Sequence, residues 1–379
     1  MSAGRKKVVV AMSGGVDSSV AAALLLREGY DVIGVFMRLG SPAGVEQAEE
    51  AAACSTAGSE GSKSKQGCCS VLDADDARRV AGILDVPFYV LNFQEDFGRV
   101  IDYFVAEYNL GRTPNPCVRC NDWLKFGKLA QYARAVGADY VASGHYARAE
   151  VDPATGRRWL MRGVDLAKDQ SYVLFGMSRE TLDHTLLPIG GLTKQHVRQL
   201  AQEFKLPVFN KPDSQEICFV PNQDYAGLVR RRSPESFRAG AFVTGSGEVV
   251  GAHGGHQQFT IGQRKGLGVA LGYPVYVVDI DPARNKVTLG QKEALLKSGL
   301  LARQLNILSD ALEVGRSTHC TAKIRYNHQP QAAVAERSAA DELVVRFDQP
   351  QSAITPGQAL VLYDGDKVLG GGWIDEAML

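Results

Sequence analysis

The sequence lacks an excess of charge of either sign, a long apolar run and an internal repeat. Its 379 residues contain 42 Lys plus Arg and 42 Asp plus Glu, so no net field attracts a polyanion, and any contact with nucleic acid needs local basic patches. No stretch reaches the roughly eighteen continuous apolar residues of a membrane helix, which excludes membrane insertion. The apolar run at 8–12 is too short for a signal-peptide core. We therefore expect a cytosolic protein.

Cysteine is scarce, and its few positions matter. In a large chain without secretion signals, cysteines are better candidates for chemistry or metal binding than for a disulfide framework. The seven cysteines are Cys54, Cys68, Cys69, Cys117, Cys120, Cys218 and Cys320. The composition, with 45% hydrophobic and 22% charged residues, rules out global disorder. The length predicts two or three domains.

The first 150 residues alternate β-rich runs with helical stretches, which predicts a parallel α/β sheet. The expected strands are 7–12, 31–37, 87–92 and 139–143, and the expected helices are 18–28, 70–84, 97–108 and 123–136. Between Gly40 and Gly67 lies a polar insertion to which we assign no fold.

After about Asp213, strand-like runs separated by glycines replace the alternation. The last part of the chain has the pattern of an antiparallel β-barrel or sandwich. We therefore predict an α/β domain at 1–215, a small central domain at 216–283 and a C-terminal β-domain at 284–379.

The strongest local motif is SGGVDSS, residues 13–19, which follows an apolar strand and opens a helix. Gly14 and Gly15 let the backbone approach an anion, and the amides at the positive end of the helix attract phosphate oxygens. Asp17 or Ser18 is expected to cap the helix. The loop has no terminal Lys, so it is not a Walker A sequence. The alternative is a glycine turn with a helix cap and no ligand.

SGGVDSS resembles the pyrophosphate loop (PP-loop) of ATP pyrophosphatases, which cleave ATP to AMP and pyrophosphate. Five further segments follow in the order of one family, the tRNA-specific 2-thiouridylases: GRTPNPCVRCN, SGHYAR, KDQSY, KPDSQEICF and GQRKGLG. The resemblance implies an adenine nucleotide alpha hydrolase-like PP-loop domain, a small central domain and a C-terminal antiparallel β-barrel. It also implies that the chain uses ATP with Mg²⁺, modifies tRNA and receives sulfur from a donor protein, a desulfurase or a sulfur relay.

The implied reaction is 2-thiolation of the wobble uridine of tRNA. The 2-oxygen of uracil is a poor leaving group, and adenylation turns it into AMP, so that a sulfur nucleophile can attack the same carbon. By the same resemblance, the ATP-binding residues are Ala11, Met12, Ser13, Gly14, Gly15, Val16, Asp17, Ser18, Met37 and Gly144. From the sequence alone, core packing is the alternative for Met37.

The resemblance assigns sulfur transfer to two cysteines. Cys218 corresponds to the persulfide carrier, and Cys120 corresponds to the partner that releases sulfur by forming a disulfide with it. The chain departs from the family pattern at Cys117, where the commoner residue is Asp. Cys117, Cys120 and Cys218 could together hold an iron–sulfur cluster with one open iron, so a persulfide route and a cluster route both stay open. We expect structural or incidental roles for Cys54, Cys68 and Cys69, and a core position for Cys320.

RNA contact has to come from local charge. Residues 225–290 hold eight Lys or Arg against four Asp or Glu, with Arg230, Arg231, Arg232, Arg264 and Lys265 as main contributors. A solvated surface is the usual meaning of such a run, but a tRNA substrate needs phosphate contacts. The resemblance adds tRNA contacts by Lys168, Asp169, Gln170, Arg325 and Tyr326, and places Asn115, Pro116 and Cys117 beside the target base.

Two other classes compete with this hypothesis. A PP-loop synthetase that adenylates a small metabolite, as amidotransferase-type enzymes do, needs an ammonia source, and no glutaminase-like segment is visible. A non-catalytic RNA-binding protein does not account for an ATP loop combined with paired cysteines.

Overall fold

A five-stranded parallel sheet forms the centre of the N-terminal half. The computed structural model describes residues 5–40, 71–213 and 217–379, and the insertion expected after Gly40, with Cys54, Cys68 and Cys69, lies outside them. The strand order is β3-β2-β1-β4-β7, with all neighbours parallel. The strands are β1 (Lys7–Ala11), β2 (Asp31–Arg38), β3 (Phe88–Asn92), β4 (Tyr140–Ser143) and β7 (Thr185–Leu186).

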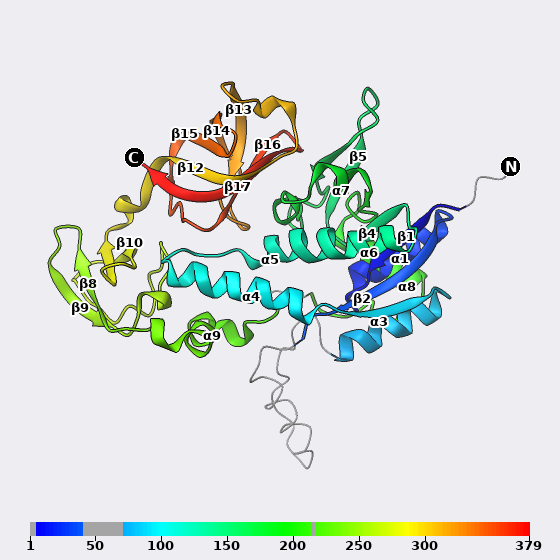
Figure 1. Ribbon diagram of the computed structural model, residues 1–379, viewed down its shortest axis with the longest axis horizontal. Helices are drawn as coiled ribbons and strands as arrows, with labels where there is room; N and C mark the ends of the chain where they lie inside the picture. Colours follow the sequence, from blue (N-terminus) through cyan, green and yellow to red (C-terminus); the bar gives the residue numbers. More distant parts are fainter. Residues whose placement is uncertain (1–4, 41–70, 214–216) are drawn as a thin grey trace, which may run out of the picture.

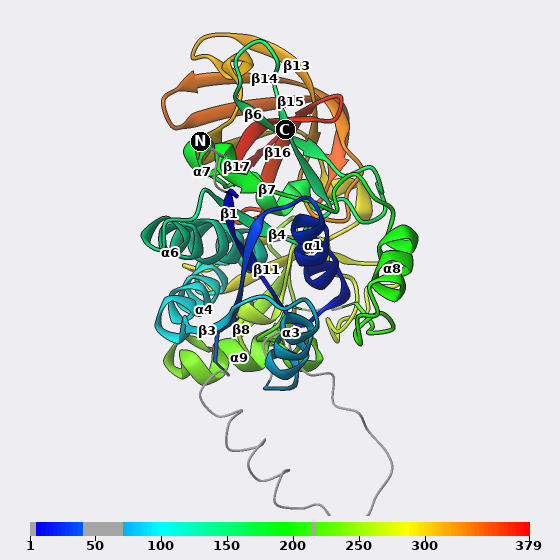
Figure 2. The same ribbon diagram turned by 90° about the vertical axis from the view of Figure 1, so that its right-hand side faces the viewer.

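Helices cover both faces of this sheet (Figure 2). One layer contains α1 (Val16–Arg27), α3 (Val71–Ile83) and α8 (Lys194–Glu203); the other contains α4 (Gln94–Asn109), α5 (Pro116–Arg119), the π-helix η1 (Cys120–Lys128) and α6 (Leu129–Ala135). Because strand side chains alternate, Val8 and Val10 pack into the core beneath α1, whereas Val9 packs into the core beneath α6. The predicted parallel α/β domain is confirmed.

A second sheet of four strands follows at the other end of the molecule (Figure 1). Its strands are β8 (Gly240–Thr244), β9 (Val249–His253), β10 (Tyr276–Asp281) and β11 (Lys286–Gly290), in the order β10-β11-β8-β9. Strand β11 pairs with β8 and β10 although it lies beyond our predicted boundary at 283. In the sequence, the short helix α7 (Arg179–Asp183) precedes β7 of the first sheet, and α9 (Tyr225–Arg232) precedes the second sheet.

The C-terminal strands close into an antiparallel barrel. They are β12 (Leu296–Ile307), β13 (Ser317–Lys323), β14 (Gln331–Ala339), β15 (Glu342–Ser352), β16 (Ala359–Asp364) and β17 (Lys367–Met378). Strand β12 pairs with both β15 and β17, which closes the barrel and removes its free edges. The predicted barrel is confirmed. Cys320 packs against the barrel core, as expected, and burial raises the pKa of its thiol to about 12.

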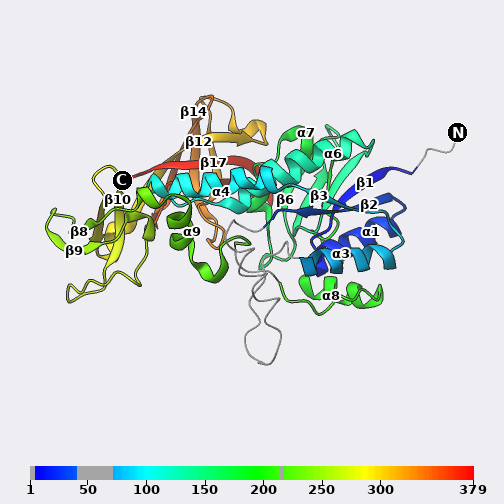
Figure 3. The same ribbon diagram turned by 60° about the horizontal axis from the view of Figure 1, so that its bottom comes forward.

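Two strands from the first half of the chain extend the barrel sheet. They are β5 (Ala147–Val151) and β6 (Arg158–Arg162), and β6 pairs with β17 through Met161 and Lys367. The barrel therefore contacts the α/β part directly, and Figure 3 shows it lying along α4.

The barrel also holds the loop that leads into α5. Arg112 forms ion pairs with Glu107 and Asp375, both at 2.9 Å. The Gln358 amide donates to the carbonyls of Thr113 and Pro114 at 3.0 and 3.1 Å. These contacts fix the entry into the helix that carries Cys120. Within the described ranges, no helix is long and apolar enough to cross a membrane.

Candidate active site

A cavity of about 620 Å³ lies where β1, β2 and β4 end. The carboxyl edge of a parallel sheet is where such folds bind ligands, and the volume is typical of a small-molecule site. Its lining includes Ala11, Met12, Ser13, Gly15, Val16, Asp17, Ser18, Met37, Cys120, Gly144, Lys168, Gln170, Cys218 and Tyr326. Fourteen of the predicted site residues are therefore brought to one cavity.

The loop from Ser13 to Ser18 depends on a backbone that only glycine adopts easily. Gly14 has φ +73°, and a Cβ there would lie 2.1 Å from the Asp73 carbonyl oxygen. The Ser18 hydroxyl accepts from the Ser13 amide at 3.1 Å, which closes the loop on itself. The bend leads straight into the positive end of α1, as an anion site requires.

The expected helix cap is wrong. Helix α1 begins at Val16, its N-cap is Gly15, and no side chain caps it. Asp17 and Ser18 lie inside the first turn, and the Ser18 hydroxyl instead contacts Ser13 and the Gly15 carbonyl. Glycine therefore occupies the cap position of α1, and no side chain fills that role.

Gly144 lies where β4 meets the start of α1. A Cβ at Gly144 would lie 2.5 Å from the Asp17 carbonyl carbon and 2.5 Å from the Ser18 nitrogen. Any larger residue would therefore push the loop away from the sheet. On the β2 side, Met37 lines the cavity with Phe36 and Leu39, which makes that wall apolar.

Asp17 belongs to a network of charges. Its carboxylate accepts from Lys194 at 2.8 and 2.9 Å and from the Tyr146 hydroxyl at 2.7 Å. Burial and the charge of Asp17 raise the pKa of Tyr146, so the phenol stays protonated and donates. Lys194 also pairs with Asp213 at 2.8 Å. Asp17 is therefore held by a cation and a hydroxyl from elements distant in the sequence.

Asp213 is the second anion of this network. It pairs with Lys168 at 2.8 Å and with Arg198 at 3.2 Å, besides Lys194. Burial alone would raise the pKa of Asp213, but hydrogen bonds from Lys168 and Lys194 outweigh it, and the pKa falls below its usual value. Asp213 is therefore an anion at neutral pH.

Lys211 ties the same segment to the glycine loop. Its ammonium donates to the Gly14 carbonyl at 3.0 Å and pairs with Asp73 and Asp76 at 2.7 and 2.6 Å. Burial opposes the charge of Lys211, but the two carboxylates raise its pKa above the usual value. The segment from Lys211 to Asp213 is thus anchored at both ends beside the loop.

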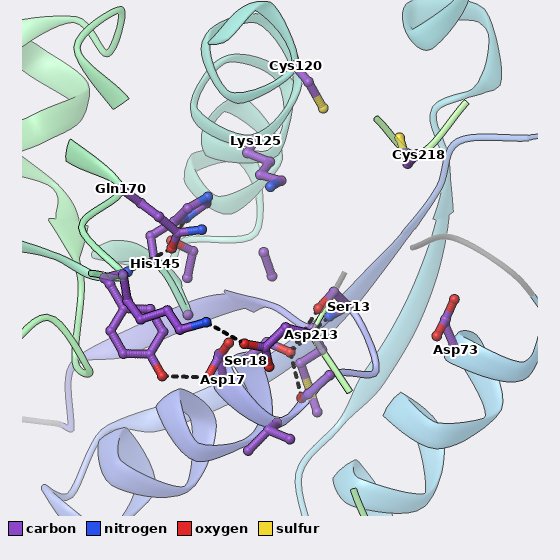
Figure 4. Close-up of a pocket in the computed structure, with 18 of the residues that line it drawn as sticks. Ser13, Asp17, Ser18, Asp73, Cys120, Lys125, His145, Gln170, Asp213 and Cys218 are labelled. Carbon is purple, nitrogen blue, oxygen red and sulfur yellow. Dashed lines mark hydrogen bonds and ion pairs between the residues drawn. The ribbon is translucent and has the colours of Figure 1, made fainter. Parts of the chain in front are cut away.

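The two candidate sulfur-transfer cysteines lie at the opposite end of the cavity from the loop. Figure 4 shows Cys120 and Cys218 there, with Ser13, Asp17 and Ser18 at the other end. Cys120 is the first residue of the π-helix, an element often found at functional sites, and Lys125 on the same helix also lines the cavity.

Cys117 stands apart from this pair, because it is exposed and does not line the cavity. Among the described residues, no group of three His, Cys, Asp or Glu side chains is arranged to hold a metal ion. The trio of Cys117, Cys120 and Cys218 therefore does not fit an iron–sulfur cluster as placed here, and no step below passes through one.

His145 was not among the predicted residues. It is buried at the cavity wall, with Nδ1 2.7 Å from the Ser143 hydroxyl. Burial, with the nearby charge of Lys125, lowers the pKa of His145 well below its usual value. The imidazole is therefore neutral at physiological pH and acts as a hydrogen-bonding group.

The predicted tRNA-contacting residues have different environments. Lys168, Gln170 and Tyr326 line the cavity. Asp169 is buried, and its carboxylate accepts from the amides of Gly163 and Ser171 at 3.0 and 3.1 Å, which fixes the loop between Lys168 and Gln170. Arg325 donates to the Ser352 carbonyl at 3.1 Å.

The residues predicted to border the target base shape the start of α5. The Asn115 side chain caps the helix by accepting from the Val118 amide, and Pro116 is its first residue. The basic residues outside the cavity, Arg230, Arg231, Arg232, Arg264 and Lys265, are all exposed. Their contact with tRNA stays a prediction.

Sequence reasoning missed several charged residues of the site. Lys211 and Asp213 belong to the KPDSQEICF segment, so the motif itself was the signal that could have assigned them roles. Lys194 and Asp73 belong to none of the motifs, and only the folded chain shows their contacts with Asp17 and Lys211.

A parallel sheet with a glycine loop at a helix start is typical of nucleotide-binding α/β proteins, and here two thiols line the same cavity. Three family models match the chain: the tRNA methyl transferase HUP domain at 6–222, the tRNA methyl transferase PRC-barrel domain at 228–291 and the Aminomethyltransferase beta-barrel domain at 297–374.

Curated relatives match over nearly the whole length. The chain is 50% identical to the tRNA-specific 2-thiouridylase MnmA of Carboxydothermus hydrogenoformans, covering 99% of each chain. It is also 50% identical to the protein of that name from Geotalea uraniireducens, covering 99% of this chain and 96% of the other. The chain therefore belongs to the tRNA-specific 2-thiouridylase family, PP-loop enzymes that act as tRNA sulfurtransferases.

Matches to solved structures are weaker. The chain aligns with the NMN synthetase from Francisella tularensis at a TM-score of 0.32 and 16% identity, over 61% of this chain and 77% of that one. The family assignment rests on the sequence relatives alone.

Proposed function

We propose that this protein thiolates the 2-position of the wobble uridine of tRNA in two steps within one cavity. The single observation that carries the proposal is that the glycine loop and the two cysteines line opposite ends of the same cavity. A metabolite synthetase would need the loop but not the cysteines.

The glycine loop fits the phosphates of ATP. The left-handed Gly14 and the uncapped start of α1 direct main-chain amides to the cavity, and Ser13 and Ser18 add hydroxyls. Phe36, Met37 and Leu39 supply an apolar wall suited to the adenine ring. Asp17, Asp73 or Asp213 beside the loop could supply one carboxylate ligand to the Mg²⁺ of the nucleotide, with phosphate oxygens and water completing its coordination.

In the first step, the uracil 2-oxygen attacks the α-phosphorus of ATP and pyrophosphate leaves. The amides of the loop and the ammonium group of Lys125, which line the cavity, would stabilise the charge that develops on the phosphates. The oxygen bonded to C2 then belongs to a good leaving group.

In the second step, the outer sulfur of a Cys218 persulfide attacks C2, and the C2–O bond breaks to release AMP. The Cys120 thiolate then attacks the inner sulfur, which forms a Cys120–Cys218 disulfide and frees 2-thiouridine. The Cys120 sulfur is oxidised from thiolate to disulfide, the transferred sulfur is reduced from the persulfide to the sulfide level, and the Cys218 sulfur keeps its oxidation state, so the electrons balance. A sulfur-donor protein and a thiol reductant must reload Cys218 between cycles.

The contribution of thiol acidity to this step is small. A pKa shift from about 8.5 to about 7 raises the thiolate fraction at neutral pH roughly fifteenfold, while nucleophilicity falls by about fivefold. Positioning of the thiols against the activated base therefore matters more. The contacts of Gln358 with Thr113 and of Asp375 with Arg112 hold the loop before α5 against the barrel and so position Cys120.

A direct test combines purified protein, ATP and an unmodified tRNA transcript, with ATP–pyrophosphate exchange and 2-thiouridine as readouts. We expect exchange that depends strictly on tRNA, and 2-thiouridine once Cys218 carries a persulfide. Exchange supported by a small metabolite without tRNA would favour the synthetase alternative. Binding of tRNA without exchange would favour an RNA-binding protein.

A further inference from the structure

A line of ion pairs connects the tRNA-facing and ATP-facing parts of the cavity. Lys168 contacts Asp213, Asp213 contacts Lys194, and Lys194 contacts Asp17, with each N–O distance at 2.8 Å. Lys168 lies in a segment for which we expect tRNA contact, and Asp17 lies in the phosphate loop. No motif of the sequence includes Lys194, the central member.

The position of Lys194 is electrostatically costly on its own element. It is the first residue of α8, where the positive end of the helix dipole disfavours a cation. Only 13% of its side chain is exposed, so water screens it little. Its ion pairs with Asp17 and Asp213 offset these costs.

The two carboxylates differ in their other partners. Asp213 has two more cations, Lys168 and Arg198, whereas among the described residues Asp17 has, besides Lys194, a hydrogen bond from the Tyr146 hydroxyl. If a tRNA phosphate draws Lys168 away, Asp213 loses a cation and attracts Lys194 more strongly. The Lys194–Asp17 pair then weakens, and the Asp17 carboxylate becomes available to magnesium nucleotide.

We infer that Lys194 is the positioning residue through which bound tRNA strengthens ATP binding. This inference rests on the proposed function and explains why adenylation would wait for tRNA. Coupling of this kind is reciprocal, so ATP must strengthen tRNA binding by the same factor. A typical coupling is about fivefold to 150-fold in affinity.

The experiment measures the affinity of a non-hydrolysable ATP analogue with Mg²⁺, with and without saturating unmodified tRNA whose anticodon begins with uridine. In the wild-type protein we expect tRNA to tighten analogue binding by about tenfold. In Lys194→Met, the affinities for the analogue with and without tRNA should differ by no more than about twofold. Lys194→Arg keeps the positive charge and should retain part of the coupling.

Two more variants make the result specific. Lys168→Met cuts the other end of the line and should also abolish the coupling, even if Lys194→Met were too unstable to measure. Lys6 precedes β1, does not line the cavity, and its ammonium donates to the Tyr140 hydroxyl at 3.1 Å. Lys6→Met should therefore leave the ratio of analogue affinities with and without tRNA unchanged. A purely structural role for Lys194 would change both affinities and leave their ratio intact.

Coupling of wild-type size in Lys194→Met would overturn the inference, as would coupling of wild-type size in Lys168→Met or no coupling in a wild-type protein that forms 2-thiouridine. Failure of the wild-type protein to form 2-thiouridine would instead contradict the proposed function.

Discussion

The two ends of the cavity are built in different ways. The ATP-facing end is a short loop between β1 and α1, held by contacts such as the Ser13–Ser18 pair and by the sheet beneath it. The thiol-facing end joins Cys120 from the start of a π-helix and Cys218 from a non-helical segment, ninety-eight positions apart in the sequence. The first end depends on local backbone shape, and the second depends on how distant parts of the chain pack.

This difference predicts that substitutions at the two ends impair different steps of the reaction. Changes at the loop should stop adenylation, and with it everything that follows. Changes at the cysteines should stop sulfur transfer but spare adenylation. Changes at the barrel contacts of α5 should weaken the second step more than the first, because these contacts lie at the Cys120 end.

The largest effect is expected from the cysteines. Cys218→Ser and Cys120→Ser should each reduce 2-thiouridine formation by at least about a thousandfold, as expected for loss of a nucleophile. Cys218→Ser should still release pyrophosphate when tRNA is bound, because adenylation uses the other end of the cavity. Wild-type amounts of 2-thiouridine from either variant would remove that cysteine from the mechanism. Cys320→Ser, in the barrel, is the matched control and should keep activity.

The next largest effect is expected at the loop. Asp17→Ala should lower tRNA-dependent ATP–pyrophosphate exchange by about a hundredfold, the usual cost of one lost electrostatic group. The free energy of unfolding should fall by only about 1 kcal/mol, because Lys194 still forms its ion pair with Asp213 when Asp17 is removed. Asp75→Ala, which removes an exposed carboxylate paired with Arg79, serves as control. Unimpaired exchange in Asp17→Ala would contradict the assignment of the loop.

A middle-sized effect is expected at the barrel contact. The Arg119 guanidinium lies 3.9 Å from the centre of the Trp373 ring of β17, so Arg119→Ala should separate the Cys120 helix from the barrel. We expect about a tenfold loss of thiolation with a smaller loss of exchange. Arg27 of α1 also lies over an aromatic ring, that of Phe204, but on the opposite face of the sheet from the Cys120 helix, and Arg27→Ala should affect neither step. Equal losses of both steps in Arg119→Ala would show that the barrel does not distinguish the two ends.

A smaller effect is expected for tRNA binding. Replacing Arg325 and Tyr326 by Ala should weaken binding, and loss of the Arg should lower the salt dependence by about one counterion. Tyr326 is 39% exposed at the cavity, whereas Arg325 donates to the Ser352 carbonyl. The single variants should therefore separate stacking from charge. If Arg325→Ala leaves the salt slope unchanged, Arg325 acts only by holding the barrel loop.

The smallest effect is expected at Cys117. Because Cys117 is exposed and outside the cavity, Cys117→Asp, which introduces the commoner family residue, should keep thiolation within about threefold in iron-free protein. Iron and acid-labile sulfide in anaerobically prepared protein, lost together with thiolation in Cys117→Asp, would instead establish the cluster route.

What could be predicted from the sequence follows the same division. The loop was found because its signal is local: seven consecutive residues between an apolar strand and a helix. The strand–helix alternation and the barrel strands were found for the same reason. The helix cap was predicted wrongly, since the pattern of hydroxyl and carboxylate residues does not reveal that Gly15 takes the cap position.

Other features could not be predicted because they depend on tertiary contacts. Asp17 and Lys194 are 177 positions apart, and nothing in the residues around either one indicates the other. Strand β6 joins the barrel through Met161 and Lys367, although the sequence around it continues the α/β half. The positions of Cys120 and Cys218 in one cavity were likewise implied only by the family resemblance.

The central claim is that one cavity adenylates tRNA and then transfers sulfur to the same base. A single-turnover experiment tests it most directly: protein whose Cys218 carries a persulfide is mixed with ATP and excess unmodified tRNA, and AMP, pyrophosphate and 2-thiouridine are measured over time. We predict that pyrophosphate appears first, that AMP and 2-thiouridine then appear together in equal amounts, and that a Cys120–Cys218 disulfide accumulates to the same level. Formation of 2-thiouridine without ATP cleavage, or without oxidation of the two cysteines, would contradict this claim.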